Sequence, residues 1–418
     1  MKPYPKYKES GIEWLGEIPE GWEVKPTKRL VSNPVIKGEG QTLLFVALEH
    51  IESTYGRTLP DFVWEDKEAD DYATFQNGDV LFGKLRPYLR KFLHVDRKGC
   101  CPTELLVLRC NGKEIYNRFL FYLVQCNWFT SLANATSYGV KMPRTSWEEI
   151  NNYYLWSPPI SEQISIATYL DLKTQQIDAL IAKKQRMIEL LKEYRTAVIN
   201  HAVTKGLNPN VKMKDSGIEW IGDIPEHWEV NRLKFLSNIK TGEKDTVNRD
   251  EHGEYPFFVR ADTVERINSY SYDGEAVLTA GDGVGVGRVF HYVNGKFDYH
   301  QRVYKISDFR DITGKFFFYY MQVNFAKAVM KISAKSTVDS LRLPMFHDFP
   351  VVFGLIQEQK AVVSYLEQKT GQIDKQIENE NKSIILLQEY RTALISNAVT
   401  GKIDLRDTVN KRNIKNLA

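Results

Sequence analysis

The sequence has few cysteines, no long hydrophobic run and almost no excess of charge of either sign. The four cysteines, Cys100, Cys101, Cys110 and Cys126, lack the paired spacing of a zinc site, so we expect reduced thiols that fill a core. No stretch approaches the ~20 apolar residues that a membrane-spanning helix needs, and residues 1–5 lack the apolar core of a secretory signal. These absences predict a cytoplasmic protein with no membrane partner.

The charge balance excludes a global field that would attract nucleic acid. The chain has 56 Lys and Arg against 53 Asp and Glu, a net charge of +3, so any nucleic-acid binding must come from local basic clusters. The eight histidines are scattered, with no pair at ligand spacing beside a carboxylate, and we predict no metal site. The 418 residues suffice for two or three cores.

The sequence contains an internal repeat. The ten residues Ser10–Pro19, SGIEWLGEIP, return as SGIEWIGDIP at Ser216–Pro225. A second unit, residues 160–204, recurs at residues 356–400 with about half of its positions identical. The bodies between these repeats show no obvious similarity to each other. Each half therefore consists of a short motif, a variable body and a long repeated segment.

The repeated segment predicts a long helix in each half. Apolar side chains recur three and four residues apart, the spacing of a coiled-coil seam. About forty helical residues would extend for about 60 Å, and the first helix should end at Gly206 before a proline turn. Two matched helices in one chain predict an antiparallel pair. The first seam comprises Ile177, Leu180, Lys184, Met187, Leu191, Tyr194 and Val198, and the second Ile373, Ile377, Ile384, Leu387, Tyr390 and Leu394.

The bodies combine strand and helix patterns, which predicts an α+β protein. We expect two α/β domains separated by a pair of long antiparallel coiled-coil helices, with an internal pseudo-twofold repeat. Expected strands lie at 43–46, 78–83, 104–108, 276–278, 288–292 and 303–306, and expected helices at 115–132 and 316–332. The expected boundaries are 1–159 for the first domain, 160–206 for the central helix, 207–355 for the second domain, 356–406 for the C-terminal helix and 407–418 for a polar tail.

Basic residues gather where the first body turns between two expected strands, at residues 83–91. Such a loop suits contacts to phosphates and readout of guanine edges by arginine. A solvated surface loop is the alternative, since charged runs usually face solvent. The candidate DNA-binding residues of this body are Lys84, Arg86, Tyr88, Arg90, Lys91, Lys141 and Arg144.

The second body carries a glycine-rich run at residues 279–288. It lacks the lysine and hydroxyl of a P-loop and precedes a strand-like stretch, so a nucleotide-binding fingerprint is not expected. We interpret it as a turn that permits close backbone approach to DNA, and residues 297–302 as a source of base or phosphate donors, with a structural role as the alternative. The candidates here are Arg260, Thr279, Arg288, His300, Gln301, Arg302, Lys335 and Arg342.

Two patterns resemble catalytic motifs without completing them. Residues 157–160, Ser-Pro-Pro-Ile, differ by one residue from the motif with which amino-methyltransferases hold a flipped base, but Ile160 offers no aromatic face. Asp61 and Glu65-Asp66-Lys67 are too close together for the two strands of a nuclease metal site. We therefore expect no catalytic residue in this chain.

The repeated motifs resemble those of one family, the specificity (S) subunits of Type I restriction-modification systems, also called the HsdS family. The matching features are the Gly-Ile-Glu-Trp motif before each body, Glu162-Gln163 and Tyr169-Leu170 after the first body, and then Gln176-Ile177-Asp178 and residues 193–197, Glu-Tyr-Arg-Thr-Ala. Copies of the last four follow the second body at residues 358–359, 365–366, 372–374 and 389–393. The resemblance spans essentially the whole chain.

The resemblance implies a non-catalytic subunit whose two domains are target-recognition domains. Each would read one half of a bipartite sequence in double-stranded DNA, while the helices set the spacer. It implies two methyltransferase (M) subunits docked on the helices and restriction (R) subunits in the full complex. S-adenosylmethionine, ATP and Mg would belong to those partners, with no cofactor in this chain. The implied partner-interface residues are Gln163, Tyr169, Leu170, Ile177, Tyr194, Arg195, Gln359, Tyr365, Leu366, Ile373, Tyr390 and Arg391.

Two other hypotheses remain beside the specificity subunit. One is a self-contained modification or nicking enzyme with a degenerate site near residues 157–160. The other is a coiled-coil scaffold with no role in DNA binding, which the helices alone would support.

Overall fold

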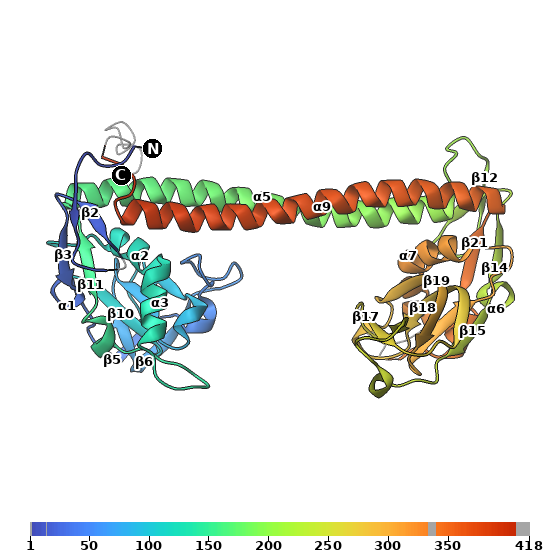
Figure 1. Ribbon diagram of the computed structural model, residues 1–418, viewed down its shortest axis with the longest axis horizontal. Helices are drawn as coiled ribbons and strands as arrows, with labels where there is room; N and C mark the ends of the chain where they lie inside the picture. Colours follow the sequence, from blue (N-terminus) through green and yellow to red (C-terminus); the bar gives the residue numbers. More distant parts are fainter. Residues whose placement is uncertain (1, 14, 333–339, 407–418) are drawn as a thin grey trace. The chain divides into compact units, whose positions relative to one another are not determined.

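The chain forms two compact units, each with its own core. The computed structural model describes residues 2–13, 15–332 and 340–406, with residues 1–183 and 383–418 assigned to unit 1 and residues 184–382 to unit 2. Each unit holds one mixed α/β domain and part of each of two long helices (Figure 1). The expected α+β class is confirmed, whereas the exact domain boundaries stay a prediction.

The long helices are α5, Ile160–Lys205, and α9, Ile356–Val399. Helix α5 begins directly after Pro159 and ends before Gly206, which adopts a φ of 73° that glycine accepts without strain. In unit 2, Lys184 Nζ donates to Glu380 Oε2, and Arg195, further along α5, donates to Asp374, which comes earlier in α9. The two helices therefore run antiparallel. The predicted antiparallel helix pair is confirmed.

The buried seam of α5 differs from the expected one. Leu180, Met187 and Tyr194 are exposed, with relative accessibilities of 43%, 47% and 49%, whereas Ile181 and Ile188 are buried. The expected spacing of three and four is correct, but Ile181 and Ile188 are buried in place of Leu180 and Met187, and Tyr194 does not belong to the buried seam. Because α5 is apolar on more than one face, periodicity alone could not choose between them. In α9, Ile373 and Ile384 are buried as expected and Tyr390 is exposed.

Unit 1 begins with short antiparallel pairings that enclose its domain. Strands β1 (Tyr7–Glu9) and β2 (Glu17–Pro19) form a hairpin, and β3 (Glu23–Pro26) pairs with β11 (Tyr154–Ser157) immediately before α5. Trp22 and Trp156 are fully buried, and Trp156 Nε1 donates to the carbonyl oxygen of Val399 at the end of α9. The two ends of the domain are thereby fixed beside the helices.

The body of unit 1 contains a sheet and a small closed barrel. The sheet has the order β4-β10-β7-β8, and the barrel consists of β5, β6 and β9. The bounds are β4 Val31–Ser32, β5 Lys37–Phe45, β6 Glu65–Phe75, β7 Val80–Gly83, β8 Phe92–His94, β9 Gly99–Cys101 and β10 Leu105–Cys110. The expected strands near 43–46, 78–83 and 104–108 are present.

Two helices of unit 1 pack on this sheet in place of the one expected at 115–132. Helix α2, Asn117–Gln125, ends at Cys126, whose ψ of 143° breaks the helix, and α3, Asn127–Ala135, follows directly. Phe129 of α3 meets Phe82 of β7 edge to face at 5.1 Å. The remaining short helices of unit 1 are α1 (Thr27–Leu30), α4 (Trp147–Ile150) and the 3-10 turns η1 (Leu48–His50) and η2 (Pro87–Leu89).

Unit 2 repeats this frame with a larger sheet. Hairpin β12–β13 (Met213–Asp215, Asp223–Pro225) and pair β14–β21 (Glu229–Arg232, Pro350–Phe353) precede α9 as β1–β2 and β3–β11 precede α5. The sheet order is β15-β20-β18-β19-β16-β17. The bounds are β15 Asn238–Thr241, β16 Tyr255–Phe258, β17 Val264–Ile267, β18 Tyr272–Ala280, β19 Phe290–Tyr299 and β20 Val303–Ser307.

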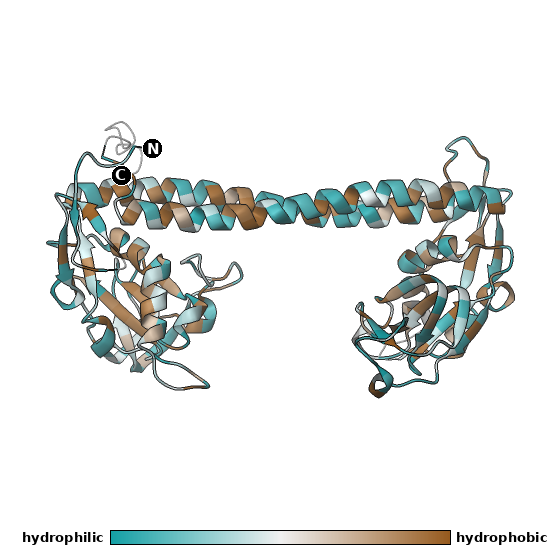
Figure 2. Cartoon of the chain, viewed as in Figure 1, coloured by the Kyte–Doolittle hydropathy of each residue, from teal (hydrophilic) through white to brown (hydrophobic). Residues whose placement is uncertain are grey.

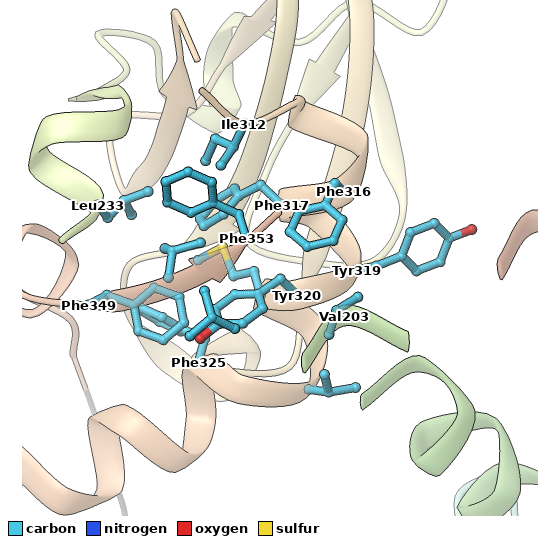
Figure 3. Close-up of a cluster of buried hydrophobic side chains, with 14 of the residues drawn as sticks. Val203, Leu233, Ile312, Phe316, Phe317, Tyr319, Tyr320, Phe325, Phe349 and Phe353 are labelled. Carbon is cyan, nitrogen blue, oxygen red and sulfur yellow. The ribbon is translucent and has the colours of Figure 1, made fainter. Parts of the chain in front are cut away.

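Helix α7, Gly314–Ile332, supplies the core of unit 2. Its Phe316, Phe317 and Tyr320 are fully buried and lie among residues of β21 and Val203 of α5 (Figure 3). Burying a large apolar side chain contributes roughly 1.5–3 kcal/mol. Helix α6 (Leu233–Leu236), helix α8 (Leu343–His347) and the turns η3 (Thr246–Asn248) and η4 (Gly283–Gly285) complete the unit.

A buried glutamine ties each long helix to its domain. Gln163 Nε2 donates to the carbonyl oxygen of Glu114 (2.9 Å), and its Oε1 accepts from the backbone N–H of Tyr116 (2.7 Å). Gln359 makes the same two bonds in unit 2, to the carbonyl oxygen of Asp311 (2.8 Å) and from the N–H of Thr313 (2.8 Å). The repeated Glu-Gln motif therefore fixes the loop before α2 or α7 to the start of a long helix.

Candidate nucleic-acid interface

In unit 1 the basic loop after β7 pairs with a second loop about sixty residues further along the chain. Leu85 and Arg144 form an antiparallel bridge, and the N–H of Arg86 donates to the carbonyl oxygen of Pro143 (2.7 Å). The backbone N–H of Thr145 donates in turn to the carbonyl oxygen of Lys84 (3.0 Å). The two loops that carry residues 84–86 and 143–145 thus form one surface.

Within this surface the side chains differ in what they can offer a ligand. Tyr88 and Lys141 are exposed, and Lys84, Arg86 and Arg144 are half-buried. These five side chains, together with their loops, form what we call the unit 1 basic surface.

Arg90 and Lys91 bond within the domain. The Arg90 guanidinium donates to Asn127 Oδ1 (2.5 Å) and to the carbonyl oxygen of Gln125 (2.6 Å), where α2 ends. Lys91 Nζ donates to the carbonyl oxygen of Leu48 (2.7 Å). Burial lowers the pKa of both side chains. Arg90 and Lys91 remain predicted DNA contacts, but their cationic groups have protein partners here.

The tip of the second loop carries apolar side chains that the sequence analysis missed. Val140 is fully exposed, and Tyr138 and Met142 have relative accessibilities of 64% and 46%. Reciprocal backbone bonds between Tyr138 and Arg144, both 2.9 Å, close the loop beneath this tip. The alternation of apolar residues with Lys141 after Gly139 was the available signal.

In unit 2 the glycine-rich turn follows β18 and is packed by its neighbours. The N–H of Gly281 donates to the carbonyl oxygen of Arg302 (2.8 Å), and a Cβ at Gly281 would lie 2.8 Å from that oxygen. Asp282 and Ser340 form an antiparallel bridge. The loop after β18 thus pairs with the segment before α8, as the loop after β7 pairs with the segment before α4 in unit 1.

A cavity of about 670 Å³ opens beside this turn. Its lining includes Arg260, Asp282, Arg288 and His300. The Asp282 carboxylate accepts from Arg260 Nη1 (2.9 Å) and from Arg302 Nη1 (2.6 Å). Burial opposes ionisation of this carboxyl group, but the two arginines outweigh it and lower its pKa.

The other unit 2 candidates differ in burial and in their bonds. Thr279 is buried and its hydroxyl donates to the carbonyl oxygen of Val289 (2.9 Å), and Gln301 donates to Asp245 (2.5 Å). Burial lowers the pKa of His300, which is 3% exposed. Arg288 and Arg342 are exposed. Lys335 lies outside the described residues.

The segment that resembled a methyltransferase motif is a helix-entry turn. Ser157 is buried, and the carbonyl oxygen of Pro158 accepts from Gln163 Nε2 (2.7 Å) just before α5 begins. Lys67, from the nuclease-like pattern, places its Nζ 4.1 Å from the ring centroid of Phe45.

Among the described residues, no group of three His, Cys, Asp or Glu side chains could hold a metal ion. No helix of this part of the chain is long and apolar enough to cross a bilayer.

The repeated motifs on the long helices pair with each other across the helix pair. In unit 1, Arg391 Nε donates to Asp178 Oδ1 (2.9 Å), and in unit 2, Arg195 Nε donates to Asp374 Oδ1 (2.9 Å). The Gln-Ile-Asp motif of one helix therefore binds the Glu-Tyr-Arg motif of the other. This pairing explains why both motifs recur together.

Most of the predicted partner-interface residues are buried inside their own unit. Tyr194, Tyr365 and Tyr390 are exposed and Arg195 is partly exposed. Figure 2 shows apolar positions interspersed with polar ones along both helices, and Leu172, Met187, Leu190, Ile385 and Leu386 are among the exposed apolar residues. The buried candidates are Gln163, Tyr169, Leu170, Ile177, Gln359, Leu366, Ile373 and Arg391.

Comparisons with known proteins agree with this architecture. Residues 225–385 match the family model of the Type I restriction modification DNA specificity domain. The Type I restriction enzyme EcoDI specificity subunit of Escherichia coli is 28% identical over 182 residues, which cover 44% of this chain and 40% of that protein. The MjaVIII specificity subunit of Methanocaldococcus jannaschii is 22% identical over 433 residues, which cover 96% of this chain and 98% of that protein.

A solved structure shares the fold. A chain from a study of complex assembly and conformational transition of the type I R-M system superposes with a TM-score of 0.76 at 17% identity, and the match covers 92% of this chain and 99% of that one. The repeated motifs, the two domains and the paired helices agree with these matches. Residues 225–385 thus match a Type I DNA specificity domain, and almost the whole chain is similar to Type I specificity subunits.

Proposed function

We propose that this chain binds double-stranded DNA with both domains and selects the target sequence for a Type I methyltransferase and endonuclease. The observation that carries the proposal is the equivalent loop pairing in the two domains, on a scaffold whose motifs are repeated. In unit 1 the pairing brings Lys84 and Arg86 beside Arg144. In unit 2 it brings Asp282, whose carboxylate binds Arg260 and Arg302, beside the segment that carries Arg342. Each domain would read one half of a bipartite target.

The unit 1 basic surface suits a DNA backbone. Lysine and arginine side chains bind phosphates and release counterions, which supplies much of the affinity of DNA-binding proteins. Tyr88 adds a hydroxyl and an aromatic face at the same surface, where it is half exposed. Phosphate contacts would position the domain, and a smaller number of base contacts would set its specificity.

We propose that two M subunits dock on the exposed faces of α5 and α9, with R subunits joining through them. Exposed Tyr194, Tyr365 and Tyr390 support this proposal, because tyrosine is enriched at protein interfaces. The buried candidates would support docking by shaping the helix pair. S-adenosylmethionine, ATP and Mg would be bound by those partners. The specificity-subunit family is non-catalytic, so this chain alone should neither methylate nor cut DNA.

A methylation map of genomic DNA tests the proposal. Cells that express the cognate M subunit are compared with and without this chain. We expect N6-methyladenine in an interrupted two-part motif only when the chain is present. An unchanged map, with both proteins expressed and folded, together with no retention of DNA by the purified complex, would favour the coiled-coil scaffold.

Isolated protein tests the alternative of a self-contained enzyme. Methylation or nicking by the chain without partners, lost on Pro158→Ala while DNA binding persists, would support a catalytic site near residues 157–160. Our proposal predicts no turnover by either form.

A further inference from the structure

Asp282 holds two arginines from different parts of unit 2. Arg260 follows β16, and Arg302 precedes β20. Both donate to Asp282 through a single Nη1 atom, at 2.9 Å and 2.6 Å. The arginine side chains are 46% and 59% exposed, whereas the carboxylate is 23% exposed. We call these three residues the Arg-Asp-Arg cluster.

The backbone around the cluster is fixed on both sides of Arg302. The N–H of Arg302 donates to His300 Nδ1 (3.0 Å), and its carbonyl oxygen accepts from Gly281, the neighbour of Asp282. His300 is itself buried, and its own N–H donates to the carbonyl oxygen of Phe258 (2.9 Å). Side chains mounted on such a backbone lose little freedom when they bind.

The backbone at Arg260 is equally constrained. Its carbonyl oxygen lies so close to Gly285 that a Cβ there would approach within 2.4 Å, so the turn accepts only glycine at this place. The two guanidinium groups therefore start from fixed points on either side of one carboxylate.

Each guanidinium retains most of its hydrogen-bonding capacity. Of the five donors on each arginine side chain, one is used on Asp282, and the others have no hydrogen-bond partner among the described residues. Arginine binds the O6 and N7 atoms of guanine through two parallel donors in the major groove. A carboxylate accepts from the N4 amino group of cytosine.

The carboxylate favours a base edge over a phosphate as the ligand. A phosphate bound between the two arginines would lie beside the negative charge of Asp282 and would be repelled. The donors and the acceptor together are instead complementary to a G·C pair, whose major-groove edge offers acceptors on guanine and a donor on cytosine.

We propose that Asp282 is a specificity-determining positioning residue that presents Arg260 and Arg302 to guanine in the half-site read by unit 2. The inference rests on the proposed DNA-recognition function and deepens it. Asp282 orients both arginines and offers an acceptor to the cytosine of the same pair, so its removal should relax base choice while the protein remains folded.

The test maps methylation in cells that carry the cognate M subunit and the full chain in one of three forms: wild type, Asp282→Ala or Asp348→Asn. Asp348 is the matched control, because it makes an exposed ion pair with Arg232 (3.2 Å) elsewhere in the same unit. We expect Asp282→Ala to reduce discrimination for guanine by about tenfold at one or two positions of one half-site. The other half-site and the Asp348→Asn map should match the wild type.

The outcomes separate this inference from the function on which it rests. No two-part motif with the wild-type chain would overturn the proposed function itself. A wild-type motif that Asp282→Ala leaves unchanged, or a half-site without guanine or cytosine, would overturn only the role of Asp282.

Arg260→Lys and Arg302→Lys keep the inference testable if Asp282→Ala lowers the melting temperature and abolishes methylation. Lysine retains the charge but lacks the planar fork. Relaxed guanine choice in these variants, at unchanged melting temperature, would support the inference, and retained choice would overturn it.

Discussion

Arg391→Ala and Arg195→Ala remove the same ion pair from two copies of one motif, yet we expect very different losses of stability. The Nε–Oδ1 distances are both 2.9 Å. The Arg391 and Asp178 side chains are 6% and 15% exposed, whereas those of Arg195 and Asp374 are 31% and 53% exposed. Burial is therefore the main variable that separates the two pairs.

The magnitudes follow from what each truncation leaves behind. Arg391→Ala leaves the Asp178 carboxylate buried without its cation, and it also removes the cation–π contact with Tyr55, whose ring centroid lies 5.3 Å away. Breaking a buried pair in this way costs about 3–5 kcal/mol. Arg195→Ala leaves Asp374 in contact with water, for which the cost is about 0–1 kcal/mol.

Hydrogen exchange measured by mass spectrometry can compare the two variants within one chain. For Arg391→Ala we expect exchange of the α9 amides at 384–399 to accelerate by about two to four orders of magnitude. For Arg195→Ala we expect less than about a fivefold change in the α5 amides at 192–204.

A double variant that replaces both charged side chains with apolar ones tests whether the loss comes from the unpaired buried charge. Asp178→Leu combined with Arg391→Met should recover most of the lost protection, because apolar replacement of a buried pair is often close to neutral. Equal effects of the two single variants, or protection in Arg391→Ala within about tenfold of the wild type, would refute the assignment of the difference to burial.

Three further predictions concern single features of the two units. Burial lowers the pKa of His94 to about 4, so the unfolded chain binds more protons than the folded one, and stability falls as the pH decreases from about 6.5 to about 4. His94→Phe should remove roughly 3 kcal/mol of this fall in unfolding curves, and an unchanged pH dependence would contradict the prediction. Lys84→Gln with Lys141→Gln should reduce the slope of log K against log salt by about 2 in DNA-binding titrations, whereas an unchanged slope would remove both lysines from the phosphate contacts. Gly281→Ala should destabilise unit 2 by about 1–3 kcal/mol in thermal unfolding, because the new Cβ would lie 2.8 Å from the Arg302 carbonyl oxygen; an unaltered melting temperature would show that the turn can move.

The sequence was sufficient for the long helices because their signals are local. Apolar spacing, Pro159 before the helix and Gly206 after it predicted α5 closely. The expected seam was wrong at Leu180, because Leu180 and Ile181 are both apolar and only the partner helix decides which of them is buried.

Strand β6 was missed for a different reason. Its first residues, Glu65-Asp66-Lys67-Glu68, are charged and exposed on a small barrel, so neither an apolar run nor alternation marks them. Their pairing with β5 depends on residues twenty or more positions away. Local propensity carries no information about such a partner.

In the candidate DNA surface, too, the sequence predicted what local composition shows and missed what depends on contacts between distant residues. Basic composition pointed to residues 84–91, but the sequence could not show that Arg90 caps the end of α2 or that Leu85 pairs with Arg144. The importance of Asp282 was equally hidden, because its role depends on two arginines that meet only in the folded unit.

The most direct test of the account is an exchange of one recognition body. Residues 24–159 are replaced by the matching body of a related specificity subunit, and genomic methylation is mapped with the cognate M subunit. The account predicts that one half of the two-part motif changes to that of the donor while the other half stays as in the wild type. A change in both halves, or in neither, from a folded and active complex would contradict it.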